Sequence, residues 1–353
     1  MPDLDAPQSF AARDPKGMLG HVVGLPQQCT EAWEKIQSFE PPDEHGRVRQ
    51  VVVLGLGGSA IGGDLLRGLV AGECPVPLIV HRDYGLPAFV DAHTLVIASS
   101  YSGNTEETLD GFDEAHRRGA RLLAVTTGGA LAERARGWGI PLYLFDYKAQ
   151  PRAALGYSLF SLLGIVQRLG FVRDKSSDAA EAVAVMRQWQ EEIQPAVPSP
   201  ANLAKLLAHE LYGRLPVVYG AEHLSEVARR WKGQCNENSK SWAVFDVAPE
   251  LMHNTVAGYP YPSGLRESLF VVVLQGAANH PRVQLRFRIV CELLQRDGFS
   301  YRVIEARGQS RLAQMLSAVQ LGDYVSYYLA MLYDVDPWEI ANIDVLKERL
   351  SAA

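Results

Sequence analysis

Short apolar runs alternate with helix-length segments along most of this chain, and this rhythm constrains the fold more than any other feature. The first set of runs, all rich in aliphatic and β-branched residues, lies at 51–54, 77–80, 94–98, 121–125 and 141–145. A second set lies at 217–219, 243–247, 269–274 and 302–304. Such an alternation is typical of βαβ units, in which helices cover parallel strands. We therefore predict an α/β fold with two doubly wound parallel sheets.

The length of the chain points to two domains. Its 353 residues exceed what a single hydrophobic core usually supports. We expect a first subdomain at 45–173 and a second at 204–353, joined by a helix and proline-containing connector at 174–203 and preceded by a helical extension at 1–44. Apolar residues at helical spacing between Trp338 and Leu350 predict a C-terminal amphipathic helix that packs on the second subdomain.

The composition excludes several classes of partner. The formal net charge of −6 provides no basic surface for nucleic acid or an anionic membrane, so we expect neither. The four cysteines form no CxxC pair, which argues against a zinc site and a disulfide framework. The N-terminus has no signal-like apolar stretch, and no run reaches the roughly 18 apolar residues that a membrane helix requires. We therefore expect a cytoplasmic protein.

A glycine segment, Gly55 to Ala60, stands between a predicted strand and a predicted helix. Backbone N–H groups and the helix dipole favour an anion at such a junction. The same segment fits the G-x-G-x-x-G/A pattern of dinucleotide-binding proteins, and Asp83 lies near the position of a ribose-binding acid. A phosphate site, a dinucleotide site and a purely structural turn all remain open from this segment alone.

A second junction, Ser99 to Glu107, carries a cluster of hydroxyl side chains. Short donors beside a glycine suit the three oxygens of a terminal phosphate, and a dinucleotide does not require them. Asn104 and Glu107 have the spacing of a helix-start cap, so we expect Asn104 to cap the helix and Thr105 to lie in its first turn. Taken with Ser59, this cluster favours phosphate binding over simple capping.

Three segments in this order, GLGGSAIGGD (55–64), HRDYGLP (81–87) and SSYSGNTEET (99–108), resemble the sugar isomerase (SIS) fold. More specifically, they resemble the bifunctional phosphoglucose/phosphomannose isomerases. The similarity continues through QCNENSKSWAVFD (234–246), PELMHN (249–254) and IDVLKERL (343–350). It implies two SIS-type subdomains and an aldose–ketose isomerase that interconverts glucose 6-phosphate and fructose 6-phosphate, with mannose 6-phosphate as a further candidate substrate.

The resemblance also implies roles for individual residues. The phosphate pocket would be formed by Gly57, Gly58, Ser59, Ser100, Ser102 and Thr105. The catalytic base would be Glu237, the ring-opening residues His253 and Lys347, and the transition-state arginine Arg152. The resemblance implies a homodimer whose active site is completed across the interface. No His/Cys/Asp cluster with ligand spacing accompanies the candidate site, so we expect no metal, and we expect no cofactor.

These residue types suit the implied reaction. One carboxylate can move a carbon-bound proton between two neighbouring carbons. A histidine that titrates near neutrality can exchange protons with the ring oxygen and the anomeric hydroxyl. A guanidinium can stabilise the negative charge that develops on the enediolate oxygens.

Two other classes of protein remain as alternatives. A non-catalytic SIS-type phosphosugar sensor would keep both loops without needing Glu237, His253 or Lys347. A dinucleotide-dependent oxidoreductase would explain the glycine segment and leave the hydroxyl cluster unexplained. The sequence also departs from the family pattern at Met252, at Thr255 and at Trp338, the last of which bears on the mannose substrate more than on the glucose substrate.

Overall fold

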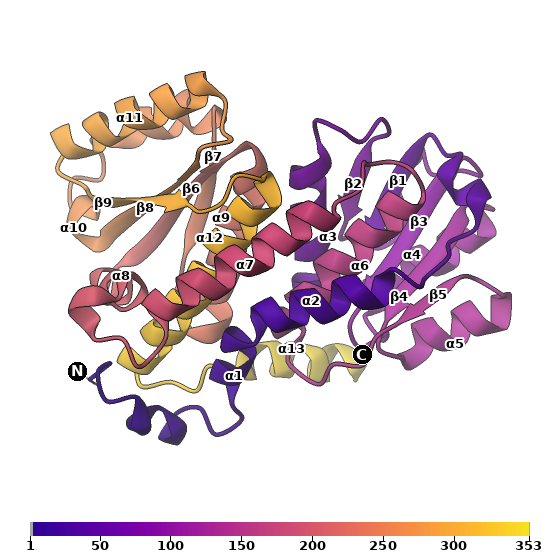
Figure 1. Ribbon diagram of the computed structural model, residues 1–353, viewed down its shortest axis with the longest axis horizontal. Helices are drawn as coiled ribbons and strands as arrows, with labels where there is room; N and C mark the ends of the chain where they lie inside the picture. Colours follow the sequence, from indigo (N-terminus) through magenta and orange to yellow (C-terminus); the bar gives the residue numbers. More distant parts are fainter. Residues whose placement is uncertain (1–2, 353) are drawn as a thin grey trace. The chain divides into compact units, whose positions relative to one another are not determined.

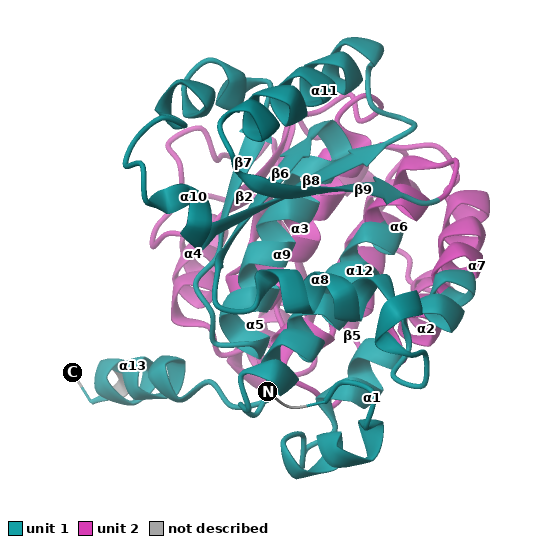
Figure 2. Ribbon diagram, turned by 90° about the vertical axis from the view of Figure 1, so that its left-hand side faces the viewer, with its two compact units in different colours: residues 1–23, 187–307, 316–353 teal, residues 24–186, 308–315 magenta. Residues whose placement is uncertain are grey.

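Two parallel sheets organise the computed structural model, which describes residues 3–352 (Figure 1). They belong to two compact units, coloured in Figure 2. Unit 2 consists of residues 24–186 and 308–315, and unit 1 of the remaining described residues. The α/β class predicted from the alternating runs is confirmed. The subdomain boundaries expected at 45–173 and 204–353 stay predictions.

The sheet of unit 2 has five strands in the order β2-β1-β3-β4-β5. Its strands are β1 (Gln50–Leu54), β2 (Leu78–His81), β3 (Thr94–Ser100), β4 (Arg121–Thr126) and β5 (Leu142–Leu144). Its helices are α2 (Leu25–Ile36), α3 (Gly57–Val70), α4 (Glu106–Arg117), α5 (Gly129–Trp138) and α6 (Leu155–Arg168). The strand order reverses between β1 and β3, and ligands of open α/β sheets bind at the carboxyl ends of the strands at such a switch point.

Burial explains why these segments form strands. Every residue of the central strand β3 is buried, which suits its run of aliphatic and β-branched side chains. The register pairs Leu54 of β1 with Ala98 of β3, and Ser100 of β3 with Thr126 of β4. The loops that follow β1 and β3 therefore leave the sheet at the same edge.

The sheet of unit 1 has four parallel strands in the order β7-β6-β8-β9. Its strands are β6 (Leu215–Ala221), β7 (Val244–Ala248), β8 (Leu269–Gly276) and β9 (Ser300–Ala306). Its helices include α1 (Met18–Val23), α8 (Leu203–Leu211), α9 (Ser225–Asn238), α10 (Leu265–Ser268), α11 (Pro281–Arg296) and α13 (Ala341–Ser351). Two further helices, α7 (Ser176–Ile193) and α12 (Arg311–Leu332), begin in unit 2 and end in unit 1.

The C-terminal helix forms as expected but does not pack as expected. The apolar residues that were predicted to dock are exposed, with Leu346 and Leu350 each 61% exposed and Ile343 38% exposed. The prediction of a docked helix is therefore wrong for a single chain. Spacing indicates an apolar face, but it does not say which surface covers that face.

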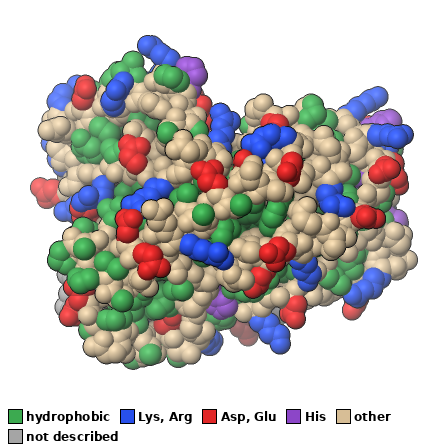
Figure 3. Space-filling view, in the orientation of Figure 1, with side chains coloured by type: hydrophobic (Ala, Val, Ile, Leu, Met, Phe, Trp, Pro, Cys, Tyr) green, Lys and Arg blue, Asp and Glu red, His purple; other side chains and the backbone are tan. Residues whose placement is uncertain are grey.

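None of the helices within residues 3–352 is long and apolar enough to cross a membrane. On the face of the molecule drawn in Figure 3, acidic and basic side chains are interspersed.

A buried polar contact joins α9 to α12 within unit 1. The Asp323 carboxylate of α12 accepts a hydrogen bond from Gln234 Nε2 at 2.7 Å and lies 3.3 Å from the Arg230 guanidinium. One turn further along α9, Asn238 Nδ2 donates to Ser326 Oγ at 3.0 Å. Burial raises the pKa of Asp323, and the neighbouring arginine and amide act in the opposite direction. Desolvation is the larger effect, so the pKa of Asp323 stays above its ordinary value although Arg230 and Gln234 oppose the rise.

We expect Asp323→Ala to lower the free energy of unfolding by about 3–5 kcal/mol, because it removes the carboxylate that compensates the buried Arg230 charge. Glu192→Ala is the matched control. It breaks an exposed pair with Arg307, whose two side chains are 50% and 38% exposed, and should cost less than about 1 kcal/mol. Urea unfolding followed by circular dichroism measures both, and equal losses would refute the buried-pair explanation.

Candidate functional site

The glycine segment forms the first turn of α3, directly after β1. Gly57 has a φ of +50°, a left-handed conformation that favours glycine. A Cβ on Gly58 would lie 2.6 Å from the carbonyl carbon of Pro151 and 2.8 Å from the backbone nitrogen of Arg152. The N-cap residue, Leu56, makes no side-chain hydrogen bond to the helix. The first turn of α3 thus packs on a second backbone segment, and its N–H groups and dipole still favour an anion.

The hydroxyl cluster forms the loop between β3 and α4. Ser100 is buried, accepts a hydrogen bond from the Gly103 N–H at 3.1 Å, and shares one with the Thr105 hydroxyl at 3.0 Å. Ser102 is exposed, and its hydroxyl accepts from the Asn104 N–H at 3.2 Å. Gly103 has a φ of +69°, and a Cβ there would overlap the Gly128 carbonyl oxygen at 1.9 Å. The loop is therefore folded tightly by its own hydroxyls.

A direct hydrogen bond links the two loops. The backbone N–H of Tyr101 donates to Ser59 Oγ at 3.0 Å. Gly58, Ser59 and Tyr101 are among the residues that line a small cavity of about 10 Å³, which has room for at most about one water. Any phosphate group would therefore meet the loops from outside this cavity. The two loops that contain the six residues assigned to phosphate binding are thus joined at the switch point between β1 and β3.

The expected helix cap at Asn104 is wrong. Helix α4 begins at Glu106 with Thr105 in the N-cap position, and no side chain caps it. The Asn104 Oδ1 atom instead accepts from the Ala130 N–H at 3.0 Å, in the first turn of α5. A cap signature reports only the spacing of residues along one helix. Here the Asn104 side chain hydrogen-bonds a backbone N–H of a different helix instead.

Arg152 lies in a short 3₁₀ turn, η3 (Pro151–Ala153), which follows β5 and precedes α6. Its side chain is buried, and the whole residue is 2% exposed. The Gln28 side chain fixes the end of this turn, since its Nε2 donates to the Ala153 carbonyl at 2.8 Å and its Oε1 accepts from the Gly156 N–H at 2.5 Å. The backbone nitrogen of Arg152 also borders the first turn of α3, since it would lie 2.8 Å from a Cβ on Gly58.

Glu237 lies in the last turn of α9 in unit 1 and is half-buried. It lines a cavity of about 630 Å³ together with Lys232, Asn236, Lys240, Trp242 and the chain at 339–343. Lys240 Nζ donates to the carbonyl oxygens of Glu237 and Asn238 at 2.7 and 3.2 Å, which closes the end of the helix. One carboxylate and two lysines therefore line a largely apolar cavity, and a carboxylate in such a place can exchange protons with a bound ligand.

His253 stands at the end of a 3₁₀ turn, η6 (Glu250–Met252), and is exposed. It is not among the residues that line the Glu237 cavity. The neighbouring departures from the family pattern have structural explanations. Met252 packs against the hydrophobic cluster of the unit 1 sheet, and the Thr255 hydroxyl donates to the Asp246 carboxylate of β7.

Lys347 lies on α13, where the residues from 341 to 350 are all exposed. The first residues of this helix line the Glu237 cavity, but Lys347 does not. Trp338, the third departure, packs on His21 with ring centroids 5.7 Å apart. Within one chain, therefore, neither His253 nor Lys347 reaches the cavity that holds Glu237.

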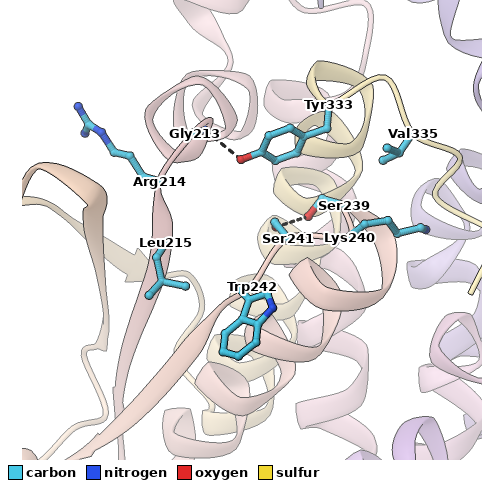
Figure 4. Close-up of a pocket in the computed structure, with 9 residues that line it drawn as sticks. All are labelled: Gly213, Arg214, Leu215, Ser239, Lys240, Ser241, Trp242, Tyr333 and Val335. Carbon is cyan, nitrogen blue, oxygen red and sulfur yellow. Dashed lines mark hydrogen bonds between the residues drawn. The ribbon is translucent and has the colours of Figure 1, made fainter. Parts of the chain in front are cut away.

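A second cavity in unit 1, of about 480 Å³, adjoins the first and shares Lys240, Ser241 and Trp242 with it (Figure 4). Its polar groups bind one another, since Gly213 N–H donates to the Tyr333 hydroxyl at 2.9 Å and the hydroxyls of Ser239 and Ser241 lie 2.8 Å apart. The Arg214 guanidinium points away from the other labelled residues in Figure 4. This cavity offers few free polar groups to a ligand.

Sequence reasoning missed two residues that hold the unit 2 site together. Tyr101 lies inside the hydroxyl segment, and its phenol contacts the loop before Arg152. Gln28 comes from α2, in the segment expected only to be a helical extension. The position of Tyr101 between two candidate phosphate ligands was a signal that could have drawn attention to it.

Comparison with known proteins identifies related sequences over nearly the whole chain. The model of the bacterial phospho-glucose isomerase C-terminal SIS domain matches residues 200–350. A bifunctional phosphoglucose/phosphomannose isomerase of Caldicellulosiruptor bescii is 44% identical over 95% of this chain and 99% of its own length. The protein of the same name from Aquifex aeolicus is 38% identical over 90% of this chain and 94% of its own length.

A solved structure supports the fold independently. The crystal structure of a hypothetical protein from Thermus thermophilus superposes with a TM-score of 0.74 over 99% of this chain and 94% of that chain. At 18% identity this likeness bears on the fold alone.

We expect Gly58→Ala to destabilise the protein by about 1–3 kcal/mol, because the added methyl group would meet the backbone of Pro151 and Arg152 and force a backbone shift. Gly137→Ala in α5 is the control, since a Cβ there meets nothing within 4 Å. It should be neutral or stabilise the helix by up to about 1 kcal/mol. Thermal and urea unfolding of both variants measure the difference, and similar stabilities would argue against the close packing of α3 on η3.

Proposed function

The chain belongs to the bifunctional phosphoglucose/phosphomannose isomerase family, and we propose that it interconverts glucose 6-phosphate and fructose 6-phosphate, with mannose 6-phosphate as a second aldose. The observation that carries this proposal is the 44% identity to a relative of that name over 95% of the chain. Neither a sensor nor a dinucleotide-dependent oxidoreductase accounts for that relationship together with the hydroxyl loop.

In this proposal the substrate phosphate binds to the two loops of unit 2. Gly57 and Gly58 offer backbone N–H groups at the start of α3, and Ser59, Ser100, Ser102 and Thr105 offer hydroxyls. Two helix N-termini without side-chain caps, those of α3 and α4, support this assignment because both dipoles favour a dianion. No basic side chain is needed for a phosphate held in this way.

The proton chemistry is assigned to Glu237. After ring opening, its carboxylate removes the C2 proton of the aldose and returns a proton to C1, so the enediol intermediate becomes the ketose. The half-buried position in a cavity of about 630 Å³ supports this role, because a sugar can enter and the carboxylate is partly shielded from water. The step as proposed uses no cofactor and no metal ion.

Arg152 is proposed to stabilise the negative charge on the enediolate oxygens, and His253 and Lys347 to move the protons that open the ring. A guanidinium keeps its charge at any working pH, so its contribution does not depend on protonation. The imidazole can accept a proton from the anomeric hydroxyl and donate one to the ring oxygen.

We further propose that the enzyme is a cytoplasmic homodimer with a shared active site. The exposed apolar side chains of α13, at Ile343, Val345, Leu346 and Leu350, support a surface that a second copy covers. The exposure of His253 and Lys347 is consistent with residues that serve the partner's cavity.

Replacement of both Ser100 and Thr105 by alanine should raise KM for the phosphosugar by tens-fold or more. Each lost hydroxyl removes a hydrogen bond to a charged group that is worth about 1.5–3 kcal/mol. Steady-state kinetics measure KM, with Ser176→Ala, a hydroxyl at the start of α7, as the control. An unchanged KM in the double variant would show that the phosphate binds elsewhere.

Glu237→Gln and His253→Asn should impair different proton transfers. The first should lower kcat by about 10²–10⁴-fold and reduce substrate hydrogen exchange with heavy water in parallel, because the base for the C1–C2 transfer is gone. The second should slow ring opening, so it should retain more exchange on an open-chain analogue than turnover of the cyclic sugar.

The control for this experiment is Glu226→Gln, which alters a carboxylate on the same helix that pairs with Arg229 at 2.8 Å. It should leave exchange unchanged. Wild-type exchange in Glu237→Gln would remove Glu237 as the base.

A further inference from the structure

Tyr101 is a junction between the two phosphate loops and the segment that carries Arg152. Its backbone N–H donates to Ser59 Oγ at 3.0 Å, and its carbonyl accepts from the Thr127 hydroxyl at 2.7 Å. These bonds fix the residue against the start of α3 and the end of β4. Both bonds use backbone atoms of Tyr101, so its phenol can bind a third segment.

The Tyr101 hydroxyl makes two hydrogen bonds to one loop. It donates to the Tyr147 carbonyl and accepts from the Ala149 N–H at 2.9 Å. Both partners are backbone groups, and both lie just before η3. A single phenol thus holds the chain that leads into Arg152, which follows three residues after Ala149.

Gln28 holds the same turn from its other end. Its amide donates to the Ala153 carbonyl at 2.8 Å and accepts from the Gly156 N–H at 2.5 Å. The absence of a Cβ at Gly58 lets the backbone of Pro151 and Arg152 approach the first turn of α3. Three contacts therefore fix the η3 turn: the Tyr101 hydroxyl binds the chain before it, Gln28 binds the chain at its end, and the first turn of α3 packs on its backbone.

Side-chain hydrogen bonds at both ends of a turn this short restrict where its central residue can point. A guanidinium contributes to a transition state only if it is held within a fraction of an ångström of the developing charge, and a misplacement of about 1 Å can cost about 10²-fold in rate. The buried position of Arg152 leaves it little freedom to correct a shift in its own backbone.

We propose that Tyr101 and Gln28 are positioning residues for Arg152 in the isomerase reaction. The inference rests on the proposed catalytic role of Arg152. Tyr101 also links this arginine to the phosphate loops, since the residue that fixes η3 lies between Ser100 and Ser102. Tyr101 thereby sets both positions: its backbone fixes the phosphate loops, and its hydroxyl fixes the segment that carries the arginine.

The alternative is that the Tyr101 ring serves only the aromatic packing near β5. The ring does lie 6.1 Å from that of Phe145. Tyr157 provides the matched control, because it stacks on the same Phe145 at 5.1 Å while its hydroxyl donates to the Glu31 carboxylate at 3.0 Å and not to a backbone group before η3. Tyr101→Phe and Tyr157→Phe each keep the aromatic ring and remove one hydroxyl.

The experiment compares Tyr101→Phe, Tyr157→Phe, Arg152→Lys and the double variant Tyr101→Phe/Arg152→Lys by steady-state kinetics and thermal unfolding. We expect Tyr101→Phe to lower kcat by about 10- to 100-fold. KM should change by no more than about twofold, because a transition-state interaction is lost and not uniform binding. Tyr157→Phe should keep kcat within about twofold, even where both variants lose similar thermal stability.

The double variant tests the coupling. If Tyr101 acts through Arg152, the double variant should lose no more than about the larger of the two single losses, because the residues work as a unit. Losses that multiply would overturn the proposal. Gln28→Met should show the same selective loss in kcat, and it carries the test if Tyr101→Phe does not fold.

The outcomes separate this inference from the proposed function. If Arg152→Lys loses activity and both Tyr101→Phe and Gln28→Met keep the wild-type kcat, the positioning role is wrong and the function stands. If Arg152→Lys itself keeps the wild-type kcat, the proposed role of the arginine fails, and the positioning role fails with it.

Discussion

The unit 2 site depends on the close contact between the first turn of α3 and the backbone of η3. A Cβ at Gly58 would lie 2.6 Å from a backbone atom of Pro151, so the contact exists only because that position has no side chain. It places the backbone of Arg152 against the glycine loop, and the hydrogen bond from Tyr101 N–H to Ser59 Oγ joins the hydroxyl loop to the same turn. Since backbone atoms form both sides of the contact, neither side can yield by a change of rotamer.

Hydrogen bonds from polar side chains fix the positions of the candidate catalytic segments in both units. In unit 2, Tyr101 and Gln28 bind carbonyl and N–H groups on either side of Arg152. In unit 1, Asp323 binds Arg230 and Gln234, which fixes the face of α9 that meets α12 and so the direction of the last turn of α9, where Glu237 lies. Buried polar groups of this kind add little stability relative to apolar side chains of the same volume, but the loss of one partner is costly, so the groups hold the backbone in the arrangement that pairs them.

The strands and the positions of the glycine and hydroxyl loops after them could be predicted from the sequence because their signals are local. Runs of buried aliphatic residues specify strands, and glycine or hydroxyl residues after them mark the functional edge of a parallel sheet. Two expectations were wrong for the same reason. Asn104 has the spacing of a cap but binds the next helix, and α13 has an apolar face that the single chain leaves exposed. The spacing of residues along the chain does not say what a side chain will meet in the folded protein.

The sequence by itself therefore determined the α/β class, the order of the strands along the chain and the family, and it supplied the candidate residues for the proposed chemistry. The tertiary structure alone decided which distant groups meet: the backbone of Arg152 with Gly58, the phenol of Tyr101 with the loop before η3, and Asp323 with α9. Local patterns report hydrophobicity and backbone preference over a few residues. Contacts between residues far apart in sequence depend on how the helices and strands pack against one another. Local sequence patterns do not specify that packing.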